Sequence, residues 1–253
     1  MLIKTQGIVI KQRSIGENDR ILTILTKDYG ILEASARGVK RIKNQLAGAS
    51  QILCYSEFCL YRGKNYYSIN SAQLIESFYH LRLDVVKLAL ACYFCDLAYL
   101  LVPSGEQAWD ELRFLLNCLF FLQSEKKSQR LLKSIYELRM MSICGFMPDL
   151  TCCAGCATYE SEQMYFLPVQ SRILCKECLE KQSRELVKWL LPPAVLQAMR
   201  QIIYAEDKQM FGFQLVGHSL EQLNFITEEY TFLHTNTTIK SLQLYKQMIQ
   251  TNP

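Results

Sequence analysis

Histidine is scarce in this chain, and the motifs on which many enzymes depend are missing. Only three histidines occur among 253 residues, and none begins a His-x-Glu or a His-Glu-x-x-His motif, which zinc deaminases and metalloproteases use at their catalytic metal. The sequence also lacks a Gly-x4-Gly-Lys-Ser/Thr phosphate loop, a Gly-x-Ser-x-Gly nucleophile elbow and a Gly-x-Gly-x-x-Gly dinucleotide loop. Enzymes built on these motifs are therefore excluded, and we expect a protein without a catalytic site.

Long uninterrupted apolar runs are missing as well. The most apolar stretch spans residues 85–102, but it contains Lys87 and Asp96. A bilayer span tolerates such residues badly, so we predict a buried helix there. The first twenty residues mix charged and apolar positions, and we expect no secretory signal in them.

Cysteine, by contrast, is abundant, with eleven residues in the chain. A secreted disulfide scaffold normally has a secretory signal and a shorter chain, so we expect reduced cysteines and a cytoplasmic protein. Six of the cysteines lie among aromatic and aliphatic residues, where a thiol behaves as a small apolar side chain. These six are Cys54, Cys59, Cys92, Cys95, Cys118 and Cys144.

The positive charge is concentrated near the N-terminus. Residues 1–80 hold 11 Lys and Arg against 6 Asp and Glu, a balance of +5, whereas the remaining 173 residues hold 17 against 18, a balance of −1. This asymmetry indicates a basic face that meets an anionic partner. Simple solubility is the alternative, because +5 over eighty residues is a modest excess.

Five short β-rich runs, separated by turn signals, occupy the first seventy-five residues. β-Branched and aromatic residues predict a strand in each run, and segments that contain Gly, Asn or Asp predict the turns. Five short strands in about seventy residues suit a small closed barrel, and an OB-fold is the simplest barrel of that size. A fragment of a larger sandwich is the alternative. The runs are residues 7–10, 21–26, 31–34, 55–61 and 66–69.

Beyond residue 80 the apolar residues recur at three- and four-residue spacing, which is typical of helices. We therefore predict a multi-domain α+β chain. An OB-fold β-barrel domain covers residues 1–80, and an all-α domain covers residues 81–253, with an inserted zinc-binding segment at residues 148–180. The predicted helices are residues 83–101, 108–123, 129–144, 194–204, 220–233 and 239–249.

Two Cys-x-x-Cys knuckles interrupt the helical half. Cys153 and Cys156 form the first knuckle, and Cys175 and Cys178 form the second after eighteen intervening residues, which resemble a short hairpin. Together the knuckles offer four thiolates, which complete a tetrahedral shell and leave no open coordination position. We predict one structural Zn²⁺ per chain at these residues.

Other arrangements of these thiols stay open. Four thiolates also hold iron–sulfur clusters, and the cysteines could instead be paired core residues or a redox disulfide. Cys152 could compete for the metal because it is adjacent to Cys153. Three residues separate it from Cys156, however, which makes it the poorer knuckle partner.

A basic run follows the third predicted strand. Four positive charges fall within seven residues around Gly38, and such a loop could bend over a phosphate backbone, with the glycine allowing close approach. A solvated loop is the alternative. A second cluster combines two basic residues with Tyr66 and Tyr67, as base-stacking surfaces often do. The predicted DNA-binding residues are Arg37, Lys40, Arg41, Lys43, Arg62 and Lys64.

Short motifs along nearly the whole chain form a distinctive combination. They are Gly7-Ile-Val-Ile10, Gly16-Glu-Asn-Asp-Arg20, Tyr29-Gly30, Ala36-Arg-Gly38, Tyr136-Glu-Leu-Arg139, Gly145-Phe-Met-Pro148 and Ile239-Lys-Ser-Leu242. No single motif is sufficient, but in combination they resemble the bacterial RecO family of recombination mediators.

This resemblance implies an N-terminal OB-fold, a helical C-terminal domain and an inserted zinc ribbon. It implies binding to single- and double-stranded DNA, strand annealing, cooperation with RecR, and a functional link to RecA and RecF at the bacterial nucleoid. It also implies a receptor for the acidic, hydrophobic C-terminal tail of single-strand-binding protein. A basic cluster where two predicted helices approach is the candidate receptor, made of Lys126, Lys127, Arg130 and Lys133. A solvated loop between the two helices is the alternative for these residues.

Two other functions remain as alternatives at this point. One is a scaffold that binds only proteins, which a lack of salt-sensitive DNA binding would indicate. The other is a zinc-dependent hydrolase or deaminase with unconventional ligands. The second would lose its activity on chelation while the fold survived.

Overall fold

We describe a computed structural model of the chain, which covers residues 1–41, 44, 46–64, 66–183 and 185–251. The residues divide into two compact units. One, the barrel unit, contains residues 1–126 and 239–253; the other, the helical unit, contains residues 127–238. The domain boundaries expected from the sequence follow the change from strands to helices, not this division by compactness, and they stay a prediction.

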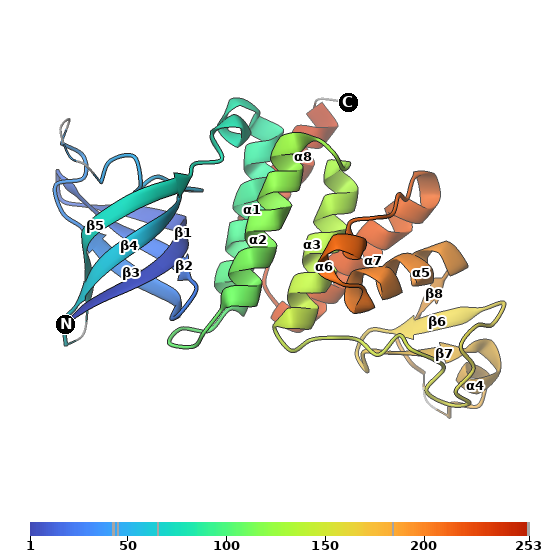
Figure 1. Cartoon of the computed structure of the whole chain (residues 1–253). Helices are drawn as coiled ribbons and strands as arrows, with labels where there is room; N and C mark the ends of the chain where they lie inside the picture. The colour runs from blue at the N-terminus through green and yellow to red at the C-terminus, as the bar shows by residue number, and fades with distance from the viewer. Residues whose placement is uncertain (42–43, 45, 65, 184, 252–253) are drawn as a thin grey trace. The chain divides into compact units, whose positions relative to one another are not determined.

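Five strands of the barrel unit close into a barrel in the order β1-β2-β3-β5-β4 (Figure 1). Neighbouring strands are antiparallel except β3 and β5, which pair in parallel. This confirms the predicted OB-like barrel and excludes the sandwich fragment. The strands are β1 (Leu2–Ile15), β2 (Asp19–Thr26), β3 (Gly30–Ala36), β4 (Tyr55–Arg62) and β5 (Tyr67–Glu76).

The barrel interior follows from the alternation of side chains along each strand. In β4, Ser56, Phe58 and Leu60 are buried while Glu57 between them is exposed, as the two-residue period of a strand requires. Aliphatic residues from the other strands fill the same interior, including Val9, Leu22, Ile24, Leu32 and Ile69.

Two strands are longer than the sequence pattern indicates. β1 runs for fourteen residues, because a bulge between Val9 and Lys11 bends it and lets it pair with β4 at one end and β2 at the other. β5 continues to Glu76 through polar residues such as Asn70 and Ser71. Hydrophobicity alone predicts only the segments of these strands that face the core.

Among its described residues the barrel unit has three α-helices, and α8 packs against α1 (Figure 1). Asp84 caps the first of them, because its carboxylate accepts the N–H groups of Val86 and Lys87 at 2.9 and 3.1 Å. A 3₁₀ turn, η1 (Tyr79–Leu83), precedes that cap. The helices are α1 (Val85–Leu101), α2 (Trp109–Ser124) and α8 (Lys240–Thr251).

The connection between α1 and α2 pairs with the β2–β3 turn of the barrel. Gly30 has a φ of +58°, and the N–H of Ile31 donates to the carbonyl of Pro103 at 3.2 Å. An added Cβ on Gly30 would lie 2.1 Å from the carbonyl oxygen of Pro103. Only glycine therefore permits this close approach.

The helical unit combines helices with a small three-stranded sheet of order β7-β6-β8 (Figure 1). Apolar residues such as Leu131, Ile135 and Leu138 on α3 are buried, and α3 packs on α7 and α5. The predicted hairpin between the cysteine knuckles is formed by β6 and β7. The elements are α3 (Gln129–Ile143), β6 (Met164–Leu167), β7 (Arg172–Cys175), α4 (Lys176–Glu180), β8 (Trp189–Leu191), α5 (Pro193–Tyr204), α6 (Asp207–Met210) and α7 (Gly217–Thr235).

Candidate metal centre and nucleic-acid interface

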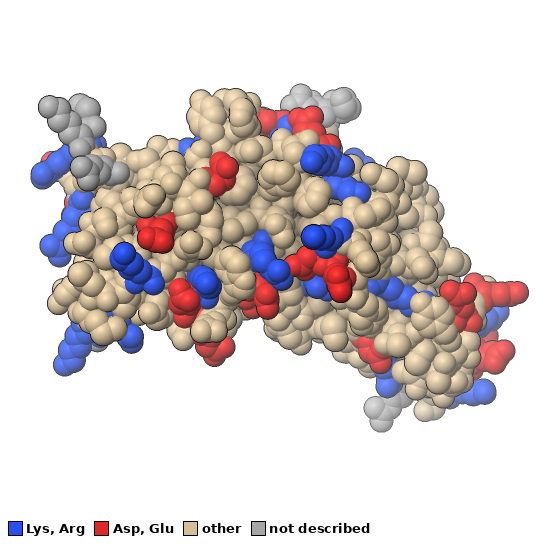
Figure 2. Space-filling model, in the orientation of Figure 1, with Lys and Arg blue, Asp and Glu red and all other residues tan. Residues whose placement is uncertain are grey.

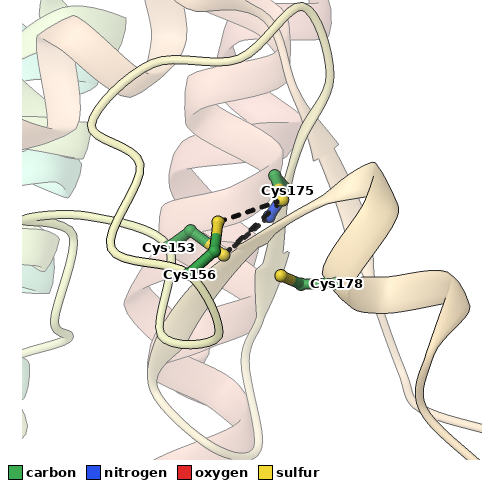
Figure 3. A group of neighbouring side chains, drawn as sticks. All are labelled: Cys153, Cys156, Cys175 and Cys178. Atoms are coloured by element: carbon green, nitrogen blue, oxygen red, sulfur yellow. Dashed lines mark hydrogen bonds between the residues drawn. The ribbon is translucent and has the colours of Figure 1, made fainter.

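The two cysteine knuckles meet at one end of the small sheet. Cys153 and Cys156 lie in a tight turn, in which the N–H of Ala157 donates to the carbonyl of Cys153 at 2.8 Å. Cys175 ends β7, and Cys178 lies on the short helix α4 that follows directly. All four sulfur atoms point toward one another (Figure 3).

The spacing of the four sulfurs fits a single tetrahedral ion. All four lie within 4.8 Å of one another, and the Sγ of Cys175 is 3.7 Å from those of both Cys153 and Cys156. Metal–sulfur bonds of about 2.3 Å in a tetrahedral shell place the sulfurs about 3.8 Å apart. An iron–sulfur cluster would hold its thiolates on different iron atoms and therefore farther apart, so the geometry favours a single ion.

Backbone N–H groups favour a thiolate at Cys153 in the first knuckle. Burial raises the pKa of Cys153, but the N–H groups of Cys175 and Gly155 donate to its sulfur at 3.3 and 3.4 Å, and the pKa falls to about 6. Close contact with the thiols of Cys156 and Cys175 raises the pKa of Cys178 to about 12. Four thiolates this close together need a cation among them.

Two residues next to the first knuckle show how the four cysteines fit together and which cysteine lies outside the cluster. An added Cβ on Gly155 would lie 2.8 Å from the Sγ of Cys178, so glycine at this position gives the second knuckle its space. Cys152 is not one of the four clustered cysteines. The knuckle pairing predicted from spacing is thus the one that the structure brings together.

Arg200 on α5 holds the first knuckle in place, and the sequence interpretation missed it. Its guanidinium is buried and donates to the carbonyls of Leu150, Thr151 and Tyr159 at 2.7, 3.1 and 2.8 Å. It also stacks on the ring of Tyr159, 3.9 Å from the centroid. The sequence signal that could have identified Arg200 is a charged residue at a position of the helix that is otherwise apolar.

A hydroxyl network fixes the other end of the β6–β7 hairpin. The hydroxyl of Tyr230 on α7 donates to the carbonyl of Phe146 at 2.9 Å, and the hydroxyl of Ser171 lies 2.9 Å from it. The Gly-Phe-Met-Pro motif before the first knuckle is therefore attached to a helix. The ring of His234 also packs against Tyr230, with 4.4 Å between centroids.

The basic loop after β3 is exposed on the barrel. Arg37, Lys40 and Arg41 have exposed side chains, whereas the loop backbone is fixed: the N–H of Gly38 donates to Asp19 at 2.7 Å, and the N–H of Lys40 donates to the carbonyl of Asn18 at 3.1 Å. Lys43, also predicted to bind DNA, lies outside the described residues. The described part of the loop thus presents cations beside a backbone that is held at Gly38 and Lys40.

The loop between β4 and β5 carries the second predicted cluster. Arg62 and Lys64 are exposed, and the half-exposed rings of Tyr61 and Tyr66 lie 6.5 Å apart beside them. In OB-folds this loop borders the nucleic-acid site. Figure 2 shows that most charged side chains along the outer edge of the barrel, at the left of that view, are Lys or Arg.

The four residues predicted to bind a partner have different environments. Lys126 and Arg130 are exposed, and Lys127 donates to the carbonyl of Phe213 at 2.6 Å. Lys133 is buried, and its ammonium is 2.8 Å from Glu137 and 3.0 Å from Glu228. This differs from the accessible cation that a receptor needs, because the ammonium of Lys133 pairs with two internal carboxylates.

The charge of Lys133 belongs to the core of the helical unit. Burial alone would lower the pKa of its ammonium, but Glu137 and Glu228 raise that pKa above its ordinary value. The hydroxyl of Thr227 also donates to Glu137 at 2.7 Å. The Tyr-Glu-Leu-Arg motif thus contributes a carboxylate to a buried ionic network.

None of the helices in the described part of the chain combines the length and apolar character that crossing a bilayer requires. The barrel with exposed cationic loops and the cluster of four cysteines together define an OB-fold protein with a cysteine cluster that could hold a metal ion.

Comparison with known proteins places the chain within that class. The family "Recombination protein O N terminal" matches residues 1–78, and "Recombination protein O C terminal" matches residues 82–243. The chain belongs to the RecO family of DNA repair proteins.

Three of the curated relatives align with the chain over 90% or more of their own length. The DNA repair protein RecO of Acetivibrio thermocellus is 33% identical over 228 residues, 90% of each chain. The proteins of the same name from Symbiobacterium thermophilum and Alkaliphilus metalliredigens are 28% and 27% identical. These two alignments cover 95% of each chain in the first case, and 98% of this chain and 100% of the relative in the second.

Proposed function

We propose that this protein binds single- and double-stranded DNA, anneals complementary strands and, with RecR, helps RecA to load onto strands coated with single-strand-binding protein. In this proposal it acts at the bacterial nucleoid, in functional connection with RecF, and catalyses no reaction of its own. Membership of a DNA repair family supports the general role.

The exposed cations of the barrel loops carry the DNA-binding part of the proposal. Among the described residues, the five basic side chains of the two loops make no ion pair, so their charge is free to meet phosphate. Cations on loops contact the phosphate backbone of DNA whatever its base sequence, and they release the counterions bound to it. Binding of this kind is therefore sensitive to salt. The five residues are Arg37, Lys40, Arg41, Arg62 and Lys64.

We propose Zn²⁺ as the ion of the four-cysteine centre, with one ion per chain and a structural role. Thiolates are soft ligands that suit zinc, and four of them leave no position for a catalytic water. Elemental analysis of purified protein should give about one zinc per chain. Iron with visible absorbance, or metal-free protein after anaerobic preparation, would contradict the assignment.

Lys126 and Arg130 are the remaining candidates for binding the tail of single-strand-binding protein. Both are exposed, and an acidic tail that ends in apolar residues needs cations beside an apolar surface. Lys127 is half-buried and contributes less, and Lys133 is excluded by its internal ion pairs.

Annealing of coated strands tests the function directly. Bare strands repel each other through their phosphates, and any basic protein accelerates their annealing by neutralising charge. We expect this protein to anneal strands coated with intact single-strand-binding protein faster than strands coated with a version that lacks the tail. Equal rates on both would mean that charge neutralisation alone is responsible, and the mediator role would be lost.

A further inference from the structure

Two adjoining cavities in the helical unit have no role in the function proposed above. One has a volume of about 360 Å³ and the other about 440 Å³. Both are lined by Gln197 and Arg200 of α5, so they form neighbouring parts of one depression beside the first cysteine knuckle. Volumes of this size are typical of ligand-binding sites.

The smaller cavity combines an apolar floor with an acidic rim. Met164, Leu191 and Leu196 line the floor and are buried. Glu160 and Glu162 line the same cavity with exposed side chains, and neither makes an ion pair with any residue that the structure describes. An apolar side chain with a cation next to it would match both features.

Arg200 does not reverse this electrostatic preference. Its guanidinium already donates to three backbone carbonyls and stacks on Tyr159. The hydrogen-bonding groups of Arg200 are therefore already engaged and offer little to a ligand carboxylate. The carboxylate would also lie near Glu160 and Glu162, which make no ion pair in the described structure. The depression disfavours acidic peptides and nucleic acids alike.

The larger cavity extends the surface with aromatic and amide groups. Tyr159 and Tyr204 line it and are 54% and 48% exposed, and Gln201 lines the same cavity. Exposed tyrosines with neighbouring amides are typical of protein-binding surfaces, because they supply contact area and hydrogen bonds at low entropic cost.

We infer that this depression is the docking site for a peptide segment of another protein that carries an aliphatic side chain beside lysine or arginine. The aliphatic group would occupy the floor formed by Met164, Leu191 and Leu196, and the cation would pair with Glu160 and Glu162. The charge of this partner is opposite to that of an acidic tail, so the site serves a second partner. This inference does not depend on DNA binding.

Fluorescence anisotropy with the metal-loaded full-length protein tests the inference. The probe is a labelled peptide of alternating lysine and leucine. Matched peptides carry glutamate in place of lysine, or serine in place of leucine. We expect saturable binding of the lysine–leucine peptide alone. Its affinity should fall about tenfold in the double variant Glu160→Gln and Glu162→Gln, which corresponds to about 1.4 kcal/mol.

A matched variant controls for general charge. Glu177 and Glu180 are also exposed, lie on α4 and line neither cavity, so their change to glutamine should leave the affinity within about twofold. Gln197 is exposed and lines both cavities, so a tryptophan at this position would fill part of the depression. Gln197→Trp should therefore abolish binding of the peptide. Circular dichroism and metal content check that each variant is folded.

Four results would overturn the inference. Equal binding of the glutamate peptide, or unchanged affinity after Gln197→Trp, would show that the depression is not the site. Weaker binding of labelled single-stranded DNA after Gln197→Trp would assign the surface to nucleic acid. Conversion of a dimer to a monomer by Gln197→Trp would identify a second copy of this chain as the occupant.

Discussion

The barrel unit and the helical unit carry their charged residues in opposite ways. On the barrel, Arg37, Lys40 and Arg41 project into solvent, and the loop is held by backbone bonds to Asp19 and Asn18. In the helical unit, Lys133 and Arg200 are buried, and their polar groups bond to internal partners.

This difference separates binding from stability. A side chain that makes no contact with the fold can be removed without unfolding it, whereas a buried charge that loses its partner is costly. We therefore expect substitutions in the barrel loops to change affinity for DNA. We expect substitutions at the buried charges and at the metal centre to change the folded state.

The largest effect is expected at the metal centre. Cys175→Ser removes the thiolate that lies 3.7 Å from two of the other sulfurs, and structural metal binding is coupled to folding. Zinc content should fall well below one per chain. The melting temperature of the helical unit should fall by more than about 10 °C, since each kcal/mol is worth about 4–8 °C in a unit of this size.

Cys152→Ser is the matched control for that substitution. Cys152 is adjacent to the first knuckle but outside the sulfur cluster, so the variant should keep its zinc and its melting temperature. Loss of metal from this variant as well would assign Cys152 to the ligand shell.

The next effect is expected at the buried ion network. Lys133→Met removes the cation from Glu137 and Glu228, and breaking a buried pair in this way costs about 3–5 kcal/mol. Arg130→Met, one turn earlier on the exposed face of the same helix, should change the free energy of unfolding by less than about 0.5 kcal/mol. Denaturant titration of both variants decides this, and equal values would place Lys133 in solvent.

A smaller loss is expected at the β2–β3 turn of the barrel. Gly30→Ala places a Cβ against the carbonyl of Pro103 in a left-handed conformation and should cost about 2–4 kcal/mol. Gly16 has a similar φ of +56°, but the space around an added Cβ is open. Gly16→Ala should therefore cost only about 1–2 kcal/mol. If thermal unfolding showed equal losses of stability in the two variants, the left-handed backbone conformation, and not the close approach to Pro103, would explain why position 30 is glycine.

Local patterns along the chain were sufficient to predict much of this architecture. Turn residues and β-rich runs predicted five strands in the correct positions, and the helix starting after Asp84 was expected within two residues of its observed start. The two knuckles identified the four clustered cysteines, because the spacing of a Cys-x-x-Cys pair fixes the local geometry of its thiols.

Features that depend on tertiary packing could not be predicted in this way. Lys133 was assigned to a partner-binding cluster, because its carboxylate partner Glu228 lies 95 positions away and only the packing of α3 on α7 brings the two together. Arg200 was missed for the same reason, since the carbonyls that it binds come from a distant loop. Sequence patterns report the chemical type of a residue but not the partner that packing supplies.

The salt dependence of DNA affinity tests whether the exposed cations of the barrel loop bind DNA. We predict that changing Arg37, Lys40, Arg41 and Lys43 to alanine leaves stability nearly unchanged. We also predict a flatter slope of log K against log salt, by up to about 0.9 per lost contact on duplex DNA and about 0.7 on single strands. The matched control changes four exposed lysines of the helical unit, Lys176, Lys181, Lys188 and Lys208, and should keep the original slope. An unchanged slope in the barrel variant, or an equal change in both variants, would show that this loop does not bind DNA.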